Sequence, residues 1–211
     1  RATYTNVSLE AVPEVVRHGA VGTGIQVTGR ALGPWEAPDV TVKVSADHLE
    51  IAGGVFDRLE IDSSLPLDGE GGASIQSAAA YWGGRTLVGF YADVGAIGDE
   101  VSFLIGNKEG TDNRVSVWGT ATTGSDTLSV RVDSARVQMN DEYVVNRGPI
   151  ELSHSAESGL SIQRLHLVGP SGEVEAVSTE DRTIQLRIHD FDLKPWAFLA
   201  GMDGRIQGTV F

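Results

Sequence analysis

The chain alternates apolar and polar residues along most of its length. The clearest stretch, "LSIQRLHLVGPSGEVEAVSTEDRTIQLRIHDFDL", spans residues 160–193. Alternation at period two is typical of β-strands that have one apolar and one polar face. The links between such stretches are short and rich in turn residues, as in "AGG", "TTGSDT" and "GPSG". Short links favour antiparallel neighbours, so we expect an all-β fold with a long, mostly antiparallel sheet.

Fourteen segments have the composition and alternation expected of strands. They lie at residues 24–29, 40–46, 48–53, 58–63, 85–92, 100–106, 114–119, 127–134, 135–140, 149–154, 160–169, 172–179, 182–193 and 205–211. Helical periodicity is almost absent. In "LKPWAFLAGMDG", Pro195 suits the first position of a helix and Gly201 suits its end, which predicts one short helix near 195–201.

The alternating apolar residues are mainly Val, Ile and Leu, and we expect them to share one face of the sheet. The predicted face residues are Val40, Val42, Val44, Ile51, Leu59, Ile61, Val101, Phe103, Ile105, Val115, Val117, Leu128, Val130, Val132, Ile150, Leu152, Leu165, Leu167, Ile184, Leu186 and Ile188. Two arrangements fit this pattern. One is a closed sandwich, in which two apolar faces pack about 10 Å apart. The other is a curved sheet folded lengthwise into an open trough, whose apolar inner face is available to a ligand.

Length and charge narrow the function classes. A chain of 211 residues suits a single all-β module, and its formal charge of -13 comes from 29 acidic and 16 basic residues spread along it. Nucleic-acid binding needs clustered Lys and Arg, so it is not expected, and an acidic surface is repelled by anionic membranes. The chain begins at Arg1 and stops within an expected strand, so we interpret it as a fragment of a longer protein.

No motif in the sequence indicates catalysis. The five histidines fall in separate elements without zinc-ligand spacing, and there is no cysteine. No GxSxG elbow, phosphate-binding glycine loop or distinctive carboxylate pair is present. We therefore expect a non-enzymatic protein with no catalytic residues, no metal site and no cofactor. The acidic turns "LDGEGG" and "NKEGTDN" suit at most a weak calcium ion.

Two long segments carry a resemblance to a known family. One is "GTGIQVTGRALGPWEAPDVTVKVSADHLEIAGGVFDRLEIDSSLPL", where a strand ending in glycine leads to a proline-containing link and paired short strands. The other runs from "LSVRVDSARVQMNDEYVVNRGPIELS" through "GLSIQRLHLVGPSGEVEAVS" to "IQLRIHDFDLKPWAFLAGMDG" and "IQGTV". This rhythm of apolar spacing resembles TamB and other AsmA-like proteins of diderm bacteria, and it covers most of the chain.

The resemblance implies a β-taco, a long curved sheet with a hydrophobic groove for phospholipid acyl chains. It also implies a periplasmic segment of a longer protein that is anchored in the inner membrane. The implied partner of that longer protein is a BamA-type outer-membrane barrel such as TamA. The implied work is phospholipid transport between the two membranes, with a role in outer-membrane protein assembly.

Two other function classes remain open from the sequence alone. An adhesion or carbohydrate-binding module, built as a closed sandwich or solenoid, would need exposed aromatic platforms. The candidates for such platforms are Trp35, Tyr81, Trp82, Tyr91 and Trp118. A glycosidase would need two carboxylates in a cleft.

Overall fold

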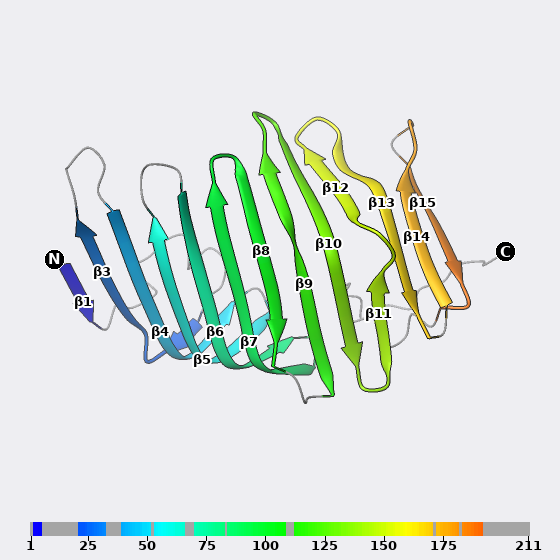
Figure 1. The fold of residues 1–211 in the computed structure, drawn as a ribbon. Coiled ribbons are helices and arrows are strands. Elements are labelled where there is room, and N and C mark those ends of the chain that lie inside the picture. Colours follow the sequence, from blue (N-terminus) through cyan, green and yellow to red (C-terminus); the bar gives the residue numbers. More distant parts are fainter. Residues whose placement is uncertain are drawn as a thin grey trace. The chain divides into compact units, whose positions relative to one another are not determined.

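The computed structural model describes residues 2–5, 21–32, 39–51, 53–65, 70–82, 84–108, 112–170, 172–181 and 183–191. Within these ranges all regular structure is β-strand and neighbouring strands pair antiparallel, so the predicted all-β class is confirmed (Figure 1). No helix suited by length and apolarity to span a bilayer occurs among the described residues. The helix predicted near 195–201 and the strand predicted at 205–211 lie outside them.

The strands belong to two compact units, Arg1–Thr111 and Asp112–Phe211. The strands of unit 1 are β1 (Ala2–Thr5), β2 (Val21–Thr23), β3 (Gln26–Leu32), β4 (Asp39–Ile51), β5 (Gly54–Leu65), β6 (Glu70–Trp82), β7 (Arg85–Ile97) and β8 (Glu100–Asn107). They form one sheet in the order β1-β3-β4-β5-β6-β7-β8. β3 pairs with the first part of β4 and β2 with its last part, so two short strands flank one long strand.

A crease crosses the long strands of unit 1. The strands pair residue by residue on both sides of one row, but the residues of that row are not paired with one another. The row consists of Asp47, Arg58, Ala78 and Gly89. Arg58 has φ 50° and Gly89 has φ 64°, the left-handed region that reverses the local path of a strand. Figure 1 shows the ends of β4 to β7 beyond this row turning behind the rest of the unit.

Apolar residues from both sides of the crease pack together. Ile25, Ala46 and Leu59 form a buried cluster, against which Leu49 and Phe56 pack from beyond the crease. The Phe56 ring lies 5.8 Å from the Phe90 ring, centroid to centroid. The bend is therefore stabilised by apolar burial between the two halves of the strands.

One buried hydroxyl serves the backbone at the crease. Ser77 is only 4% exposed. Its Oγ lies 2.7 Å from the carbonyl oxygen of Asp57 and 2.8 Å from that of Ala79, and donates a shared hydrogen bond to them. Ser77 thus supplies a donor to backbone carbonyl groups where the ladder of backbone hydrogen bonds is interrupted.

The strands of unit 2 are β9 (Asn113–Thr123), β10 (Thr127–Met139), β11 (Glu142–Asn146), β12 (Ile150–Ser155), β13 (Gly159–Gly169), β14 (Gly172–Ser178) and β15 (Ile184–His189). The sheet order is β9-β10-β11-β13-β14-β15, and β12 pairs with β10 and β13. β11 pairs with the end of β10, and β12 with its beginning. A long strand is again flanked by two short ones, as in unit 1.

Asn146 holds the backbone where β10 is interrupted. β10 shifts register against β9 between Val132 and Ser134, so Asp133 is an extra residue. Asn146 Oδ1 accepts the Ala135 N–H at 2.7 Å, while its Nδ2 donates to the carbonyl oxygens of Asp133 at 3.1 Å and Gly148 at 2.7 Å. One side chain therefore takes the place of the missing ladder bonds.

Several predicted strand limits are wrong. Residues 40–46 and 48–51 are parts of the single strand β4, which ends at Ile51, and residues 127–134 and 135–139 are parts of the single strand β10, which ends at Met139. The alternation of apolar and polar residues changes phase at the crease in β4 and at the bulge in β10. In the sequence such a change of phase looks like the end of one strand and the start of another. The strands β1, β2, β6 and β11 are missing from the prediction. The β6 segment "EGGASIQSAAAYW" is made largely of Gly, Ala and Ser and lacks the β-branched enrichment of a typical strand.

Replacing Asn146 tests its role at the bulge. We expect Asn146→Ala to lower the free energy of unfolding by about 1 to 3 kcal/mol, because the Ala135 N–H loses its acceptor. Urea denaturation followed by far-UV circular dichroism measures this change. Gln138→Ala is the control, since Gln138 belongs to the bulged strand β10 and its Nε2 donates to the Asn140 carbonyl oxygen at an exposed site. Equal losses in the two variants would contradict the assignment.

Candidate functional site

In unit 1 the predicted apolar residues fall into rows that cross the sheet. Val44 lies opposite Ile61, Ile61 opposite Ile75, and Ile75 opposite Ala92, which is opposite Ile105. Directly opposed residues of antiparallel strands project from the same face. The register therefore places on one face, the aliphatic face of unit 1, the predicted residues Val40, Val42, Val44, Leu59, Ile61, Val101, Phe103 and Ile105.

Ile51 lies beyond the crease of unit 1. It is half-buried on the same side of β4 as Leu49, which packs against the cluster of Ile25, Ala46 and Leu59. The change of phase at the crease therefore keeps Ile51 with the aliphatic face. Leu59, only 3% exposed, is packed within the cluster itself.

In unit 2 the predicted residues also share one face. Leu165 lies opposite Ala176 and Ala176 opposite Leu186, while Val130 lies opposite both Ala121 and Leu152. By this register the aliphatic face of unit 2 contains the predicted residues Val115, Val117, Leu128, Val130, Val132, Ile150, Leu152, Leu165, Leu167, Ile184, Leu186 and Ile188.

Two bulges keep this face aliphatic along the whole length of β10 and β13. Before Asp133 the face residues of β10 are Val130 and Val132, and after it they are Ala135, Val137 and Met139. A second register shift lies in β13, where Gln163 is the extra residue opposite Glu151 and Leu152. Before it the face residues of β13 are Leu160 and Ile162, and after it they are Leu165 and Leu167. Without the extra residue, half of each strand would turn its aliphatic side chains to the polar side.

Both faces contain aliphatic residues beyond those predicted from the sequence. The missed residues that the register adds include Val27, Ala73, Ile75, Phe90, Ala92, Val94, Ala121, Ala135, Val137, Met139, Val144, Leu160, Ile162, Val174 and Ala176. The sequence does contain a sign of the bulges. In "VRVDSARVQM" and "SIQRLHL" one pair of successive apolar residues is three positions apart and not two, which shifts the alternation beyond that point.

The aliphatic faces are only partly covered by the described residues. No large side chain among them is fully buried. Leu160 is 55% exposed and Leu186 is 58% exposed, and Leu128 and Ile184 are exposed as well. Apart from the cluster around Ile25, the one other buried core cluster in the described part is Met139 with Val144. Apolar side chains of unit 2 are thus available for contact, whereas the predicted face residues of unit 1 are buried or half-buried.

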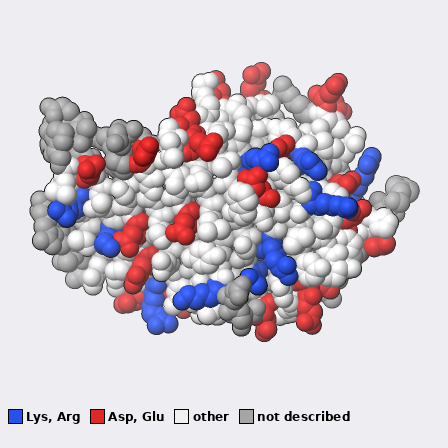
Figure 2. All heavy atoms as spheres, in the orientation of Figure 1, with Lys and Arg blue, Asp and Glu red and all other residues white. Residues whose placement is uncertain are grey.

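The opposite faces are mostly polar, with single exposed apolar residues such as Val88, Leu104 and Val177, and they carry most ion pairs of the described residues. The pairs include Lys43 with Asp62 at 2.5 Å, and Arg131 with Asp133 and Glu151 at 2.7 Å each. Figure 2 shows charged side chains of both signs spread over the surface that it presents. Exposed pairs of this kind contribute little stability each, so the polar faces serve mainly to keep water contact.

Histidines on the polar faces form pairs with carboxylates. A hydrogen bond with His48, 2.9 Å from Nδ1 to Oδ1, lowers the pKa of Asp57, and Asp57 in turn raises the pKa of Tyr81 by a hydrogen bond. His166 Nε2 lies 2.9 Å from Glu173 Oε2, and this hydrogen bond lowers the pKa of Glu173. No group of three or more His, Cys, Asp or Glu suited to hold a metal occurs in the part of the chain that the structure describes.

The ionisation of Glu173 predicts an acid effect on stability. Because its folded pKa lies below the ordinary value of 4.5, its contribution is present above about pH 4.5 and is lost as the pH falls through the lowered pKa. We expect Glu173→Gln to be less stable than the wild type near neutral pH, with a difference that shrinks below pH 4.5. Urea midpoints measured against pH test this. Glu100→Gln, which removes an exposed charge from β8, is the control; a difference that is constant with pH would contradict the prediction.

Comparison with known proteins adds no relative. No family model, no curated protein and no solved structure matches the chain.

Proposed function

We propose that the aliphatic faces bind phospholipid acyl chains, and that the chain is a non-enzymatic periplasmic part of a TamB-like carrier. In this proposal phospholipid moves between the inner and outer membranes of a diderm bacterium along the apolar surface. The longer protein is anchored in the inner membrane, engages a BamA-type barrel such as TamA, and has a role in outer-membrane protein assembly. The observation that carries the proposal is the collection of partly exposed aliphatic side chains on one face of each unit.

Hydrocarbon transfer supplies the physical reason. Exposing one methylene group to water costs about 0.8 kcal/mol, so a sixteen-carbon chain meets a barrier on the order of 10 kcal/mol. A continuous row of Val, Ile and Leu removes much of this barrier. Such contacts lack direction, so neighbouring positions along the rows are nearly equivalent. An acyl chain is then able to slide between them without a covalent step.

The bend in unit 1 supports the trough in this proposal. The crease carries the ends of β4 to β7 out of line with the rest of the strands, so the aliphatic face of unit 1 lies on the inside of the fold. We infer that acyl chains lie on the concave side of the bend, between the strand ends beyond the crease and the rest of the strands. Val42, Val44 and Ile61 are half-buried on this side. Headgroups stay in water at the open side, which needs no deep polar pocket.

A glycan-binding module is the second candidate, favoured by exposed aromatic residues. Trp82 is 59% exposed, Tyr81 is its neighbour in β6, and Trp118 is exposed in β9. Tyr81 and Trp82 are consecutive, so they project from opposite faces of the strand and do not form one platform. Tyr91 is half-buried and Trp35 lies outside the described residues. These aromatic residues therefore support sugar stacking less well than the aliphatic faces support lipid binding.

Native mass spectrometry of the chain purified from bacteria separates the two candidates. The acyl-chain proposal predicts adducts with the masses of phospholipids, which lipid extraction then identifies. Glycan binding without any lipid adduct would favour the second candidate. Delipidated protein titrated with a fluorescent sixteen-carbon fatty acid gives the affinity.

Charges placed on the aliphatic face test the proposal directly. We expect Leu186→Asp and Val130→Asp each to weaken fatty-acid binding about tenfold or more, because a carboxylate is costly among acyl chains. Fluorescence titration measures the dissociation constants, and circular dichroism checks that the variants fold.

Two matched variants place the same charge on the polar face. Leu104→Asp removes a leucine from β8 that is 38% exposed on the side opposite Phe103 and Ile105. Ser129→Asp changes the neighbour of Val130 in β10. Both controls should bind like the wild type. Folded Leu186→Asp and Val130→Asp proteins with unchanged affinity would refute acyl-chain binding at this face.

A further inference from the structure

The sheet of unit 2 forks at β13. From Gly159 to Arg164 this strand pairs with β12, and from Leu165 to Gly169 it pairs with β14. The pairing of β13 with β14 begins at Leu165 and Ala176, while the remainder of β14 pairs with β15 alone. Ile162 N–H donates to Ser178 Oγ at 2.8 Å across the fork. A side chain, not the backbone ladder, therefore joins β13 to β14 in this part.

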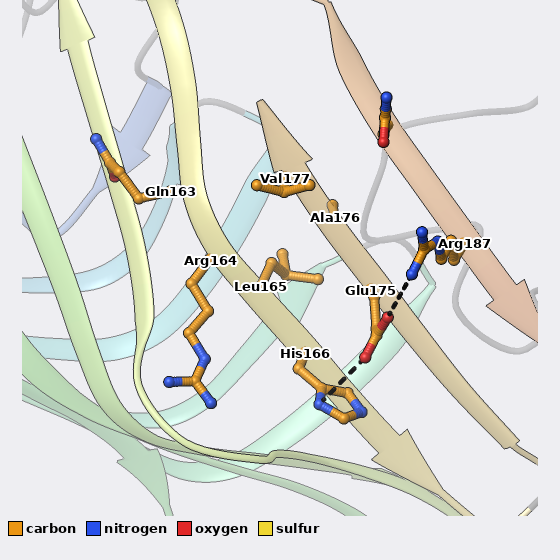
Figure 3. A pocket seen from close by; sticks show the side chains of 9 residues that line it. Gln163, Arg164, Leu165, His166, Glu175, Ala176, Val177 and Arg187 are labelled. Atoms are coloured by element: carbon orange, nitrogen blue, oxygen red, sulfur yellow. Dashed lines mark ion pairs between the residues drawn. The ribbon is translucent and has the colours of Figure 1, made fainter. Parts of the chain in front are cut away.

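A cavity of about 330 Å³ lies at the fork. Its polar lining consists of Gln163, Arg164, His166, Glu175, Gln185 and Arg187 (Figure 3). The bulge in β13 leaves Gln163 and Arg164, two consecutive residues, both exposed. The volume is within the range of small-ligand sites, and it is large enough for a polyatomic group.

Arg164 is the basic group of the cavity that has no acidic partner in the described residues. Glu151, opposite Arg164 in the register, is 2.7 Å from Arg131 instead. The Arg164 guanidinium lies over Gly148, where a Cβ atom would come within 2.9 Å of Nη2. The glycine thus leaves room for a guanidinium that no described carboxylate neutralises.

The other ionisable groups of the cavity are joined to one another. Glu175 lies 3.6 Å from His166 Nδ1 and 4.0 Å from Arg187 Nη1, and Figure 3 shows these two pairs as dashed lines with Arg164 apart from them. Arg187 is 82% exposed in its side chain, so its guanidinium has further donors free to reach a ligand. The lining thus holds two arginines and one carboxylate, which leaves an excess of positive charge. This excess is local, since the whole chain carries -13.

We propose that the fork is a subsite for a phosphate-ester anion, with Arg164 as its principal ligand and Arg187 as a second one. Guanidinium groups match the oxygens of phosphate by paired, charge-assisted hydrogen bonds. Leu165 and Ala176 line the same cavity and belong to the aliphatic face of unit 2. The phosphate ester could be a lipid headgroup or a soluble molecule. Only the lipid headgroup depends on the acyl-chain proposal.

The test uses the whole chain and three probes. They are glycerol 3-phosphate, a short-chain phosphatidylglycerol below its critical micelle concentration, and the matching diacylglycerol, which lacks the phosphate. Dissociation constants come from calorimetry, and side-chain amide signals of Gln163 and Gln185 in NMR spectra report on the cavity. We expect Arg164→Gln to weaken both phosphate probes about tenfold and to leave diacylglycerol unchanged. Arg187→Gln should have a smaller effect, because Arg187 already faces Glu175.

Arg136→Gln is the matched control. Arg136 belongs to β10 of the same unit, and its guanidinium lies over the Tyr143 ring at 5.2 Å, outside the cavity. This variant should bind all three probes like the wild type. Equal weakening by Arg136→Gln and Arg164→Gln would overturn the subsite, because it would indicate a general charge effect.

The remaining outcomes separate the two proposals. Binding of both lipids with the same affinity in the wild type and Arg164→Gln overturns the anion subsite and leaves acyl-chain binding standing. Binding of glycerol 3-phosphate that depends on Arg164, without binding of either lipid, supports the subsite for a soluble ester and refutes the lipid source. Absence of phosphate binding in the wild type overturns the subsite.

Discussion

The structure depends on the strict alternation of side chains along a β-strand. A sheet of long strands keeps one face aliphatic only if every irregularity in the backbone is matched by a change of phase in the sequence. The change at Asp133 is matched by the step from Val132 to Ala135, and the change in β13 by the step from Ile162 to Leu165. Backbone irregularity and residue pattern therefore agree at both places. This agreement indicates that the aliphatic face is a feature that the sequence specifies.

The irregular places need polar side chains to serve the backbone. Ser77 at the crease and Asn146 at the bulge lie where carbonyl and amide groups lose their regular partners. Ser178 has the same role at the fork, where it accepts the Ile162 N–H. Each of them projects from the sheet where an aliphatic residue would otherwise fit the pattern. At these three places the apolar surface is interrupted by a side chain that bonds to the backbone.

Much of the fold could be predicted from the sequence, because its information is local. The alternation in "VTVKVSA" or "TIQLRIH" identifies a strand and its apolar face without knowledge of its neighbours. Strand limits were less predictable. β6 has Ala and Ser on its apolar face, where neighbouring strands supply the larger side chains, so its own segment gives little signal. Close approach is equally hidden: a Cβ at Gly119 would lie 2.1 Å from the Arg131 carbonyl oxygen, which only the register across β9 and β10 reveals. The fork, and the position of Arg164 without an acidic partner among the described residues, depend on three strands at once and have no local signal.

The order of pairing has a consequence for how such a chain forms. In each unit most neighbours in the sheet are consecutive in sequence, and the exceptions skip a single strand. Strands that are close in sequence lose little chain entropy when they pair. We therefore expect the sheet to fold quickly for a β-protein of this size. Each finished hairpin is also a template for the next one, as in repeat proteins that lengthen by adding similar modules. Growth hairpin by hairpin lets evolution adjust the reach of the sheet by duplicating or deleting strands in pairs, without redesigning a central core.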